Sequence, residues 1–186
     1  MQPRIHCLKR TNLAKIDEPT ETLNITLTIP LQKREIKSMA EIQGTWSQID
    51  VAGKTADIYE PRQPNPKPRA ILHLHGHGLE TLKDNPFFSA ELEKHGLFAI
   101  CPHGQRSWWT DVICNEFDPE ITPIHYLRES VVPEIATRWD VTSPGIGLTG
   151  ISMGGQGVLQ LAYRFPREFP VVAAISPAVD FHQWHG

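Results

Sequence analysis

Residues 145–157, which read GIGLTGISMGGQG, constrain the fold of this chain more than any other stretch. They place Ser152 in a Gly-x-Ser-x-Gly pattern, after a strand-like run and before a glycine-rich segment that can begin a helix. A serine held at such a sharp turn needs small residues two positions before and after it, and Gly150 and Gly154 occupy those positions. The pattern therefore predicts an exposed serine that a neighbouring base could activate as a nucleophile.

The alternative for Ser152 is a glycine-rich helix cap in a strand–helix–strand crossover, which could hold a phosphate. A phosphate-binding P-loop would need a Gly-Lys-Ser or Gly-Lys-Thr triplet, and none follows here. A dinucleotide fingerprint would need an acidic residue about twenty positions on, where residues 169–175 read FPVVAAI. The surrounding sequence therefore favours a catalytic serine.

Charge and cysteine content exclude several other classes. The chain has 186 residues, with 18 Lys and Arg against 21 Asp and Glu. These charges are interspersed, so neither a nucleic-acid footprint nor a membrane-binding basic patch is expected. The first residues contain no apolar signal core, and no apolar run is long enough to span a bilayer. The odd count of cysteines, at positions 7, 101 and 114, indicates reduced thiols and a cytoplasmic location.

The chain is expected to have a 1–44 N-terminal extension and a 45–186 α/β domain. Strict alternation over 22–29 predicts one strand in the extension. Strands at 45–51 and 54–60, around Ala52-Gly53, predict an antiparallel hairpin. Beyond it, apolar strands at 70–75, 97–102, 145–150 and 171–176 alternate with helices at 85–96, 122–139 and 153–164. This alternation predicts a mostly parallel sheet with helices on both faces, and Pro133 predicts an irregularity in the middle helix.

Four stretches of the sequence carry a likeness to one family. LHLHG ends in His75-Gly76-His77-Gly78, and ICPHGQR has His103 directly after the proline that ends a strand. YLRESVVPEIATRWDV precedes the serine, and GISMGGQG is followed by AISPAVDFHQWHG. Together these stretches resemble the α/β-hydrolase superfamily, and within it the putative-esterase group that includes esterase D and S-formylglutathione hydrolase. In order, they are similar to the oxyanion loop of that group, to its Pro-Asp-x-x-x-Arg-Gly loop with His103 in place of the acid, to the helix before the serine, and to the serine turn with the strand that follows it.

The resemblance implies an α/β-hydrolase fold and specific roles for three residues. Ser152 would be the nucleophile, and the backbone N–H groups of Met153 and His77 would form the oxyanion hole. No cofactor is implied. The expected activity is the hydrolysis of small-molecule carboxylic esters or thioesters through an acyl-enzyme on Ser152.

The sequence departs from the superfamily's order of Ser, then acid, then His, because it stops soon after the 171–176 strand. The last strands of the fold and their loops are expected to be missing, which predicts a C-terminally truncated sequence and an open apolar sheet edge. A second possibility within this chain uses Asp180 as the acid and His182 as the base, with His185 nearby. Two residues so close in sequence are poorly placed to line up as Asp–His–Ser.

Several further residues permit other interpretations. His73, His75 and His77 alternate and could face one zinc ion, but the Asp-His pair typical of such sites is replaced by Gly78-Leu79. Trp108 and Trp109 could line a substrate pocket or pack locally. Cys101 and Cys114 are expected to be buried. Arg106 could receive an anionic substrate. Two other functions stay open: an oligopeptidase-like serine hydrolase and a non-catalytic α/β-hydrolase scaffold used in binding.

Overall fold

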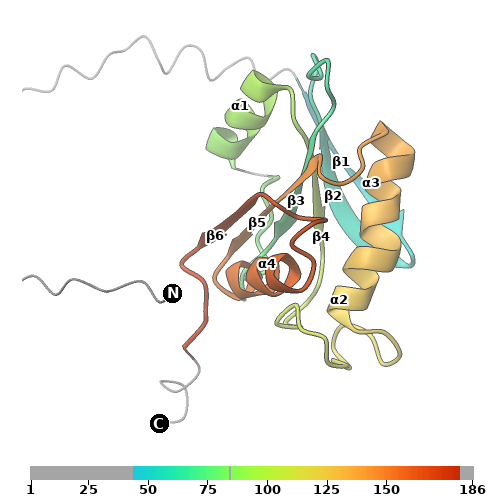
Figure 1. Ribbon diagram of the computed structural model, residues 1–186, viewed down its shortest axis with the longest axis vertical. Helices are drawn as coiled ribbons and strands as arrows, with labels where there is room; N and C mark the ends of the chain where they lie inside the picture. The colour runs from blue at the N-terminus through green and yellow to red at the C-terminus, as the bar shows by residue number, and fades with distance from the viewer. Residues whose placement is uncertain (1–43, 84, 181–186) are drawn as a thin grey trace, which may run out of the picture. The chain divides into compact units, whose positions relative to one another are not determined.

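The computed structural model of the protein describes residues 44–83 and 85–180 (Figure 1). The strand expected at 22–29, and with it the 1–44 extension up to residue 43, lies outside these residues. Within the described residues, no helix is both long enough and apolar enough to cross a bilayer.

The predicted hairpin is confirmed. Strands β1 (Thr45–Val51) and β2 (Lys54–Glu60) pair antiparallel, from Thr45 opposite Glu60 to Val51 opposite Lys54. Ala52 and Gly53 turn the chain with φ values of 50° and 78°, the left-handed region that a tight hairpin requires. The other edge of β2 pairs antiparallel with β4 (Phe98–Pro102).

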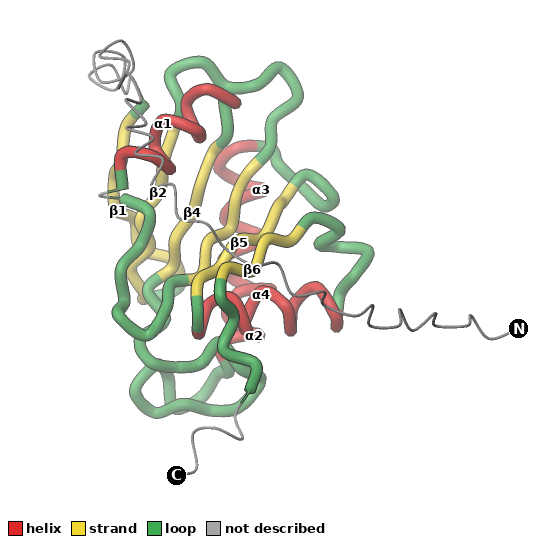
Figure 2. Tube along the Cα trace, turned by 90° about the vertical axis from the view of Figure 1, so that its left-hand side faces the viewer, coloured by secondary structure: helices red, strands yellow, loops and turns green. Residues whose placement is uncertain are grey.

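The remaining strands form the parallel part of a six-stranded sheet of order β1-β2-β4-β3-β5-β6 (Figure 2). β3 (Ala70–Leu74) lies between β4 and β5 (Ile146–Ile151), and β6 (Val172–Ile175) follows β5. Leu72 is paired with both Ile100 and Leu148, so the carboxyl ends of these strands meet at one edge of the sheet. Ligand sites of open parallel sheets form at that edge.

Helices cover both faces of the sheet, as predicted (Figure 1). On one face, α1 (Pro86–His95) packs Leu92 into a small cluster with Tyr59 and Ala99. The Asn85 side chain caps the beginning of α1, and Gly96, at φ 60°, ends it. The larger core lies on the opposite face, where α3 (Val132–Trp139) and α4 (Met153–Arg164) contribute Ile135 and Val158.

The irregularity expected at Pro133 is a widened helical turn. The predicted helix consists of α2 (Pro123–Tyr126), the π-helical segment η2 (Leu127–Val131) and α3. At its end the Val132 N–H reaches back five residues to the Leu127 carbonyl. Proline has no N–H to donate and crowds the preceding turn, so a wider turn accommodates it without ending the helix.

The expected open apolar edge is present within the described residues, where β6 ends the sheet. Val172 and Ile175 point to opposite faces of this strand, and their exposed fractions are 38% and 43%. Val171, directly before the strand, is 63% exposed. Such an edge offers unpaired backbone groups beside apolar side chains.

Candidate active site

Ser152 lies at a sharp turn between β5 and α4, with φ 53° and ψ −113°. This conformation costs a non-glycine residue roughly 1–3 kcal/mol. Three backbone hydrogen bonds hold it. The Ser152 N–H donates to the Ile175 carbonyl over 2.9 Å, and the Ser152 carbonyl accepts from Gln156 and Ala178 over 3.0 and 3.1 Å. The strained turn is therefore fastened to β6, to α4 and to the segment after β6.

The two glycines of the Gly-x-Ser-x-Gly pattern are required by close backbone contacts. A Cβ atom added to Gly150 would overlap the carbonyl of Gly154, and one added to Gly154 would overlap the carbonyl of Leu74. The sequence prediction that these positions need minimal side chains is confirmed. The first turn of α4 thereby comes close to the end of β3.

The segment after β3 forms a second turn beside Ser152. The Leu79 N–H donates to the Gly76 carbonyl over 3.0 Å, so His77 and Gly78 occupy the middle of this turn. Middle amides of such a turn do not take part in its closing hydrogen bond. Met153 begins α4, and the first amides of a helix have no acceptor within the helix. Both amides that the sequence proposed for an oxyanion hole thus belong to segments that meet at Ser152.

His75 holds this second turn in place through hydrogen bonds of its imidazole ring. The Gly104 N–H donates to its Nε2 over 3.0 Å, which leaves the proton on Nδ1 to donate to the Gly76 carbonyl over 2.8 Å. The Trp109 indole N–H donates to the His75 carbonyl over 3.1 Å, and the two rings meet edge to face. Burial lowers the pKa of His75 and favours this neutral form.

A cavity of about 320 Å³ opens in front of Ser152. Its wall comes from the end of β5, the turn after β3, the segment leading to α1 and α1 itself. The lining residues are Gly76, His77, Gly78, Glu80, Thr81, Leu82, Asn85, Phe88, Ile151 and Ser152. The cavity therefore combines a serine hydroxyl and several polar groups with the apolar side chains of Leu82, Phe88 and Ile151, and placed polar groups of this kind orient a small molecule in a binding site.

The described residues place no histidine or carboxylate in a hydrogen bond with the Ser152 hydroxyl. Asp180, the expected acid, is exposed just beyond β6, and His182 lies outside the described residues, as does His185. One Asp–His pair that sequence reasoning missed lies elsewhere on the same sheet edge. His103 Nε2 donates to the buried Asp57 over 2.9 Å, and His103 lines a different hollow. In the sequence, Asp57 stands between the apolar residues Ala56 and Ile58 of a predicted strand, and this position of a carboxylate was the available signal.

The three alternating histidines do not share one environment. His73 packs near Phe88, His75 against Trp109, and the exposed His77 faces Trp108. Across the described residues, no three His, Cys, Asp or Glu side chains come close enough to hold a metal ion.

The other singled-out residues are mainly structural. Trp109 is fully buried and fills the space beside Gly104 and Gly157, so it packs locally instead of lining the cavity. Cys101 is buried as expected, and burial raises the pKa of its thiol to about 12. Cys114 is only half-buried. Arg106 faces Glu116 over 3.5 Å.

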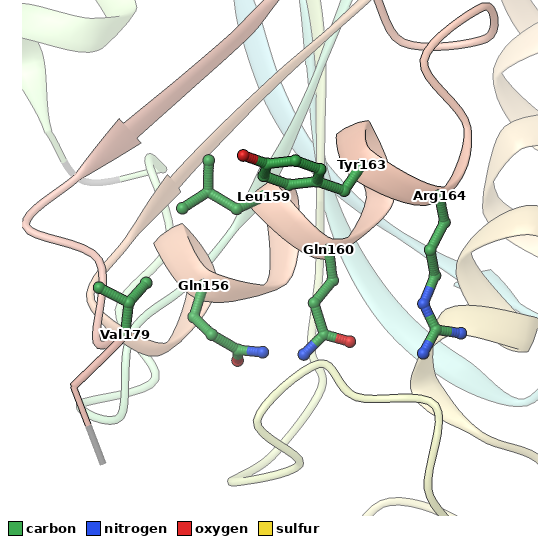
Figure 3. A pocket seen from close by; sticks show the side chains of 6 residues that line it. All are labelled: Gln156, Leu159, Gln160, Tyr163, Arg164 and Val179. Carbon is green, nitrogen blue, oxygen red and sulfur yellow. The ribbon is translucent and has the colours of Figure 1, made fainter. Parts of the chain in front are cut away.

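A second hollow, of about 370 Å³, lies along α4 (Figure 3). Leu159 and Tyr163 lie side by side above it, and Val179 approaches from the segment after β6. Gln156, Gln160 and Arg164 complete the lining. Neither Ser152 nor any candidate catalytic group lines this hollow, so the cavity in front of Ser152 is the candidate active site.

Comparisons with known proteins agree with this architecture. The family model described as Putative esterase matches residues 55–184. No curated protein sequence matches the chain.

Three solved structures illustrate the similarity in fold. S-formylglutathione hydrolase from Agrobacterium tumefaciens has a TM-score of 0.54 at 16% identity, with 76% of this chain and 66% of that chain covered. The fluorophosphonate-binding serine hydrolase F of Staphylococcus aureus has a TM-score of 0.60 at 16% identity, with 76% of this chain and 60% of that chain covered. The ferulic acid esterase of Anaeromyces mucronatus has a TM-score of 0.55 at 20% identity, with 74% of this chain and 60% of that chain covered. The chain therefore spans less than two thirds of each structure, and at these identities the likeness shows the α/β-hydrolase fold.

Proposed function

The chain belongs to the Putative esterase family of α/β-hydrolases, and on that basis we propose that it is a serine hydrolase of small-molecule carboxylic esters or thioesters. The observation that carries the proposal is the conformation of Ser152, at φ 53° and ψ −113° on the wall of a 320 Å³ cavity. A strained serine turn facing a cavity is the arrangement that presents a nucleophile to substrate.

The proposed reaction is acyl transfer in two steps. Ser152 Oγ attacks the carbonyl carbon while a histidine takes the hydroxyl proton, and the carbonyl oxygen becomes an oxyanion. The amides of Met153 and His77 donate to that oxygen, each contributing about a hundredfold or more in rate. The tetrahedral intermediate collapses, and the leaving alcohol or thiol receives the proton from the histidine. Water then attacks the acyl-enzyme in the same way, which releases the acid and restores Ser152.

No described histidine is hydrogen-bonded to the Ser152 hydroxyl, so we look for the base among the residues that the structure does not describe. His182 with Asp180 is the candidate pair within the chain. If they serve, His182→Ala and Asp180→Ala lower turnover by orders of magnitude. If both variants keep full activity, another histidine must be the base.

Labelling with a fluorophosphonate probe tests the role of Ser152. The probe phosphonylates an activated serine, so the protein gains one adduct that peptide mapping assigns to Ser152. Ser152→Ala abolishes the adduct, whereas Ser176→Ala, a nearby exposed serine, leaves it unchanged. Equal labelling of the Ser152→Ala variant, or no labelling of the native protein as isolated from its source, contradicts the proposal and favours a non-catalytic scaffold.

The bond that is cleaved is tested with matched substrates. Hydrolysis of a p-nitrophenyl ester or of an acyl thioester, both lost in Ser152→Ala, supports the proposed chemistry. Faster cleavage of a peptide p-nitroanilide than of either would favour the oligopeptidase-like alternative.

A further inference from the structure

We propose that Asp57 is a positioning residue for the Ser152 site, because its carboxylate fixes the 77–83 segment that forms one wall of the cavity. The proposal rests on the proposed function only in its labelling measurement, and a second measurement does not depend on activity.

Asp57 lies on β2, away from Ser152, and its side chain is only 3% exposed. Both carboxylate oxygens are engaged. Oδ1 accepts from Gln48 Nε2 over 2.8 Å and lies 3.6 Å from Lys83 Nζ. Oδ2 accepts from Thr81 Oγ1 over 2.8 Å and from His103 Nε2 over 2.9 Å. One buried carboxylate thus joins β1, the segment before α1 and the segment after β4.

Thr81 connects this carboxylate to the active-site cavity. It lines the cavity in front of Ser152, between Glu80 and Leu82, which line it too. Its hydroxyl donates to Asp57 and also accepts from the Lys83 N–H over 3.3 Å. Because the hydroxyl bonds in both directions, the middle of the 77–83 segment is held at one distance from β2.

The same carboxylate also acts on the other end of this wall. His103 donates to Asp57, and the next residue, Gly104, donates its N–H to His75 Nε2. His75 in turn holds the Gly76 carbonyl, which closes the turn containing His77. Asp57 therefore supports the proposed oxyanion turn through His103 and the cavity wall through Thr81.

The negative charge of Asp57 strengthens the hydrogen bonds that its carboxylate accepts. Burial by itself raises the pKa of this carboxyl, but hydrogen bonds from His103, Gln48 and Thr81 outweigh it, and the net pKa is lowered. The carboxylate stays ionised, and charge-assisted hydrogen bonds to it are stronger than neutral ones.

Thr81→Val tests the connection most cleanly, because it removes the hydroxyl and keeps the shape. We expect faster hydrogen–deuterium exchange in peptides covering residues 77–83, by about tenfold, the loss expected for one such hydrogen bond. Fluorophosphonate labelling of Ser152 slows by about the same factor. Thr81→Ser, which retains the hydroxyl, restores both to within about twofold of the parent.

A control and a double variant separate positioning from general destabilisation. Asp118→Asn removes another paired carboxylate, 2.6 Å from Lys54 and outside the Ser152 cavity, and leaves exchange over 77–83 unchanged. Asp57→Asn accelerates exchange, and adding Thr81→Val to it has little further effect, because the two groups act together.

The two hypotheses fail in different ways. If Thr81→Val leaves exchange over 77–83 unchanged, or if Asp118→Asn accelerates it as much, the positioning role is overturned whatever the labelling shows. If the native protein as isolated from its source does not label but exchange responds as expected, Asp57 still positions the segment and only the serine-hydrolase proposal fails. An unchanged labelling rate in a Thr81→Val variant with faster exchange overturns the link to Ser152.

Discussion

Individual side chains give the Ser152 cavity a negative rather than a positive character. Glu80 lines the cavity, and neither a lysine nor an arginine belongs to the described lining. Lys83, close by in sequence, lies 3.6 Å from Asp57 and pairs with that buried carboxylate. Phe88 adds an aromatic ring to the wall. If Ser152 is the nucleophile, an acyl group with a positive charge meets a carboxylate there, and an anionic one meets repulsion.

Glu80→Gln should reduce this discrimination by about two- to fivefold, the range expected for an exposed ion pair. The measurement is the ratio of kcat/KM for a cationic and an anionic acyl ester that share one leaving group. Glu91→Gln, an exposed carboxylate on α1 outside the cavity, serves as the control. An unchanged ratio in Glu80→Gln would mean that Glu80 does not face the bound acyl group.

Short sequence signals predicted where several helices and strands begin and end, because those ends depend on residues close by in the chain. The Ala52-Gly53 turn, the Asn85 cap and the Gly96 stop each fix an element's end within a few residues. The Gly-x-Ser-x-Gly pattern likewise located the Ser152 turn. The Asp57 contacts could not be foreseen, because they join residues 24 and 46 positions apart in sequence. Pro133 signalled an irregular helix but not that the turn would widen to a π-helical one.

Because β6 leaves an apolar edge of the sheet exposed, we expect the chain to self-associate. Val171→Lys places a charge beside the exposed edge, and we expect it to lower the concentration-dependent association of the chain. Light scattering over a range of protein concentrations measures the effect. Tyr163, 85% exposed above the hollow in Figure 3, gives the comparison. If Tyr163→Lys prevents association and Val171→Lys does not, the hollow along α4 and not the strand edge is responsible.

The stability of the whole molecule should depend on pH through a buried histidine. His73 is fully buried, and neither ring nitrogen has a hydrogen-bond partner among the described residues. Burial, with a smaller effect of nearby His75, lowers its pKa from 6.5 to about 4. Between these values the unfolded chain takes up a proton that the folded chain does not, so stability is lost as the pH falls.

His73→Leu should therefore flatten the decrease in the free energy of unfolding between pH 7 and pH 4.5. The parent chain is expected to lose about 2–3 kcal/mol from this histidine over that range, at about 1.4 kcal/mol per pKa unit. Urea denaturation at the two pH values gives the comparison, with the exposed His125→Gln as control. A parent and a His73→Leu variant with the same pH dependence would show that His73 is not the titrating group.

The hydrogen bond from the Ser152 N–H to the Ile175 carbonyl has a consequence for how long the serine stays poised. Its acceptor belongs to the outermost strand of the described sheet, and strands at such a border fray more readily than central ones. Each fraying event releases one of the three bonds that hold the unfavourable φ of Ser152, so the population of competent molecules follows the local opening of β6. A segment that pairs with the exposed edge of β6 would reduce the local opening of this strand. It would thereby raise the fraction of molecules whose Ser152 is correctly held, without contacting the cavity.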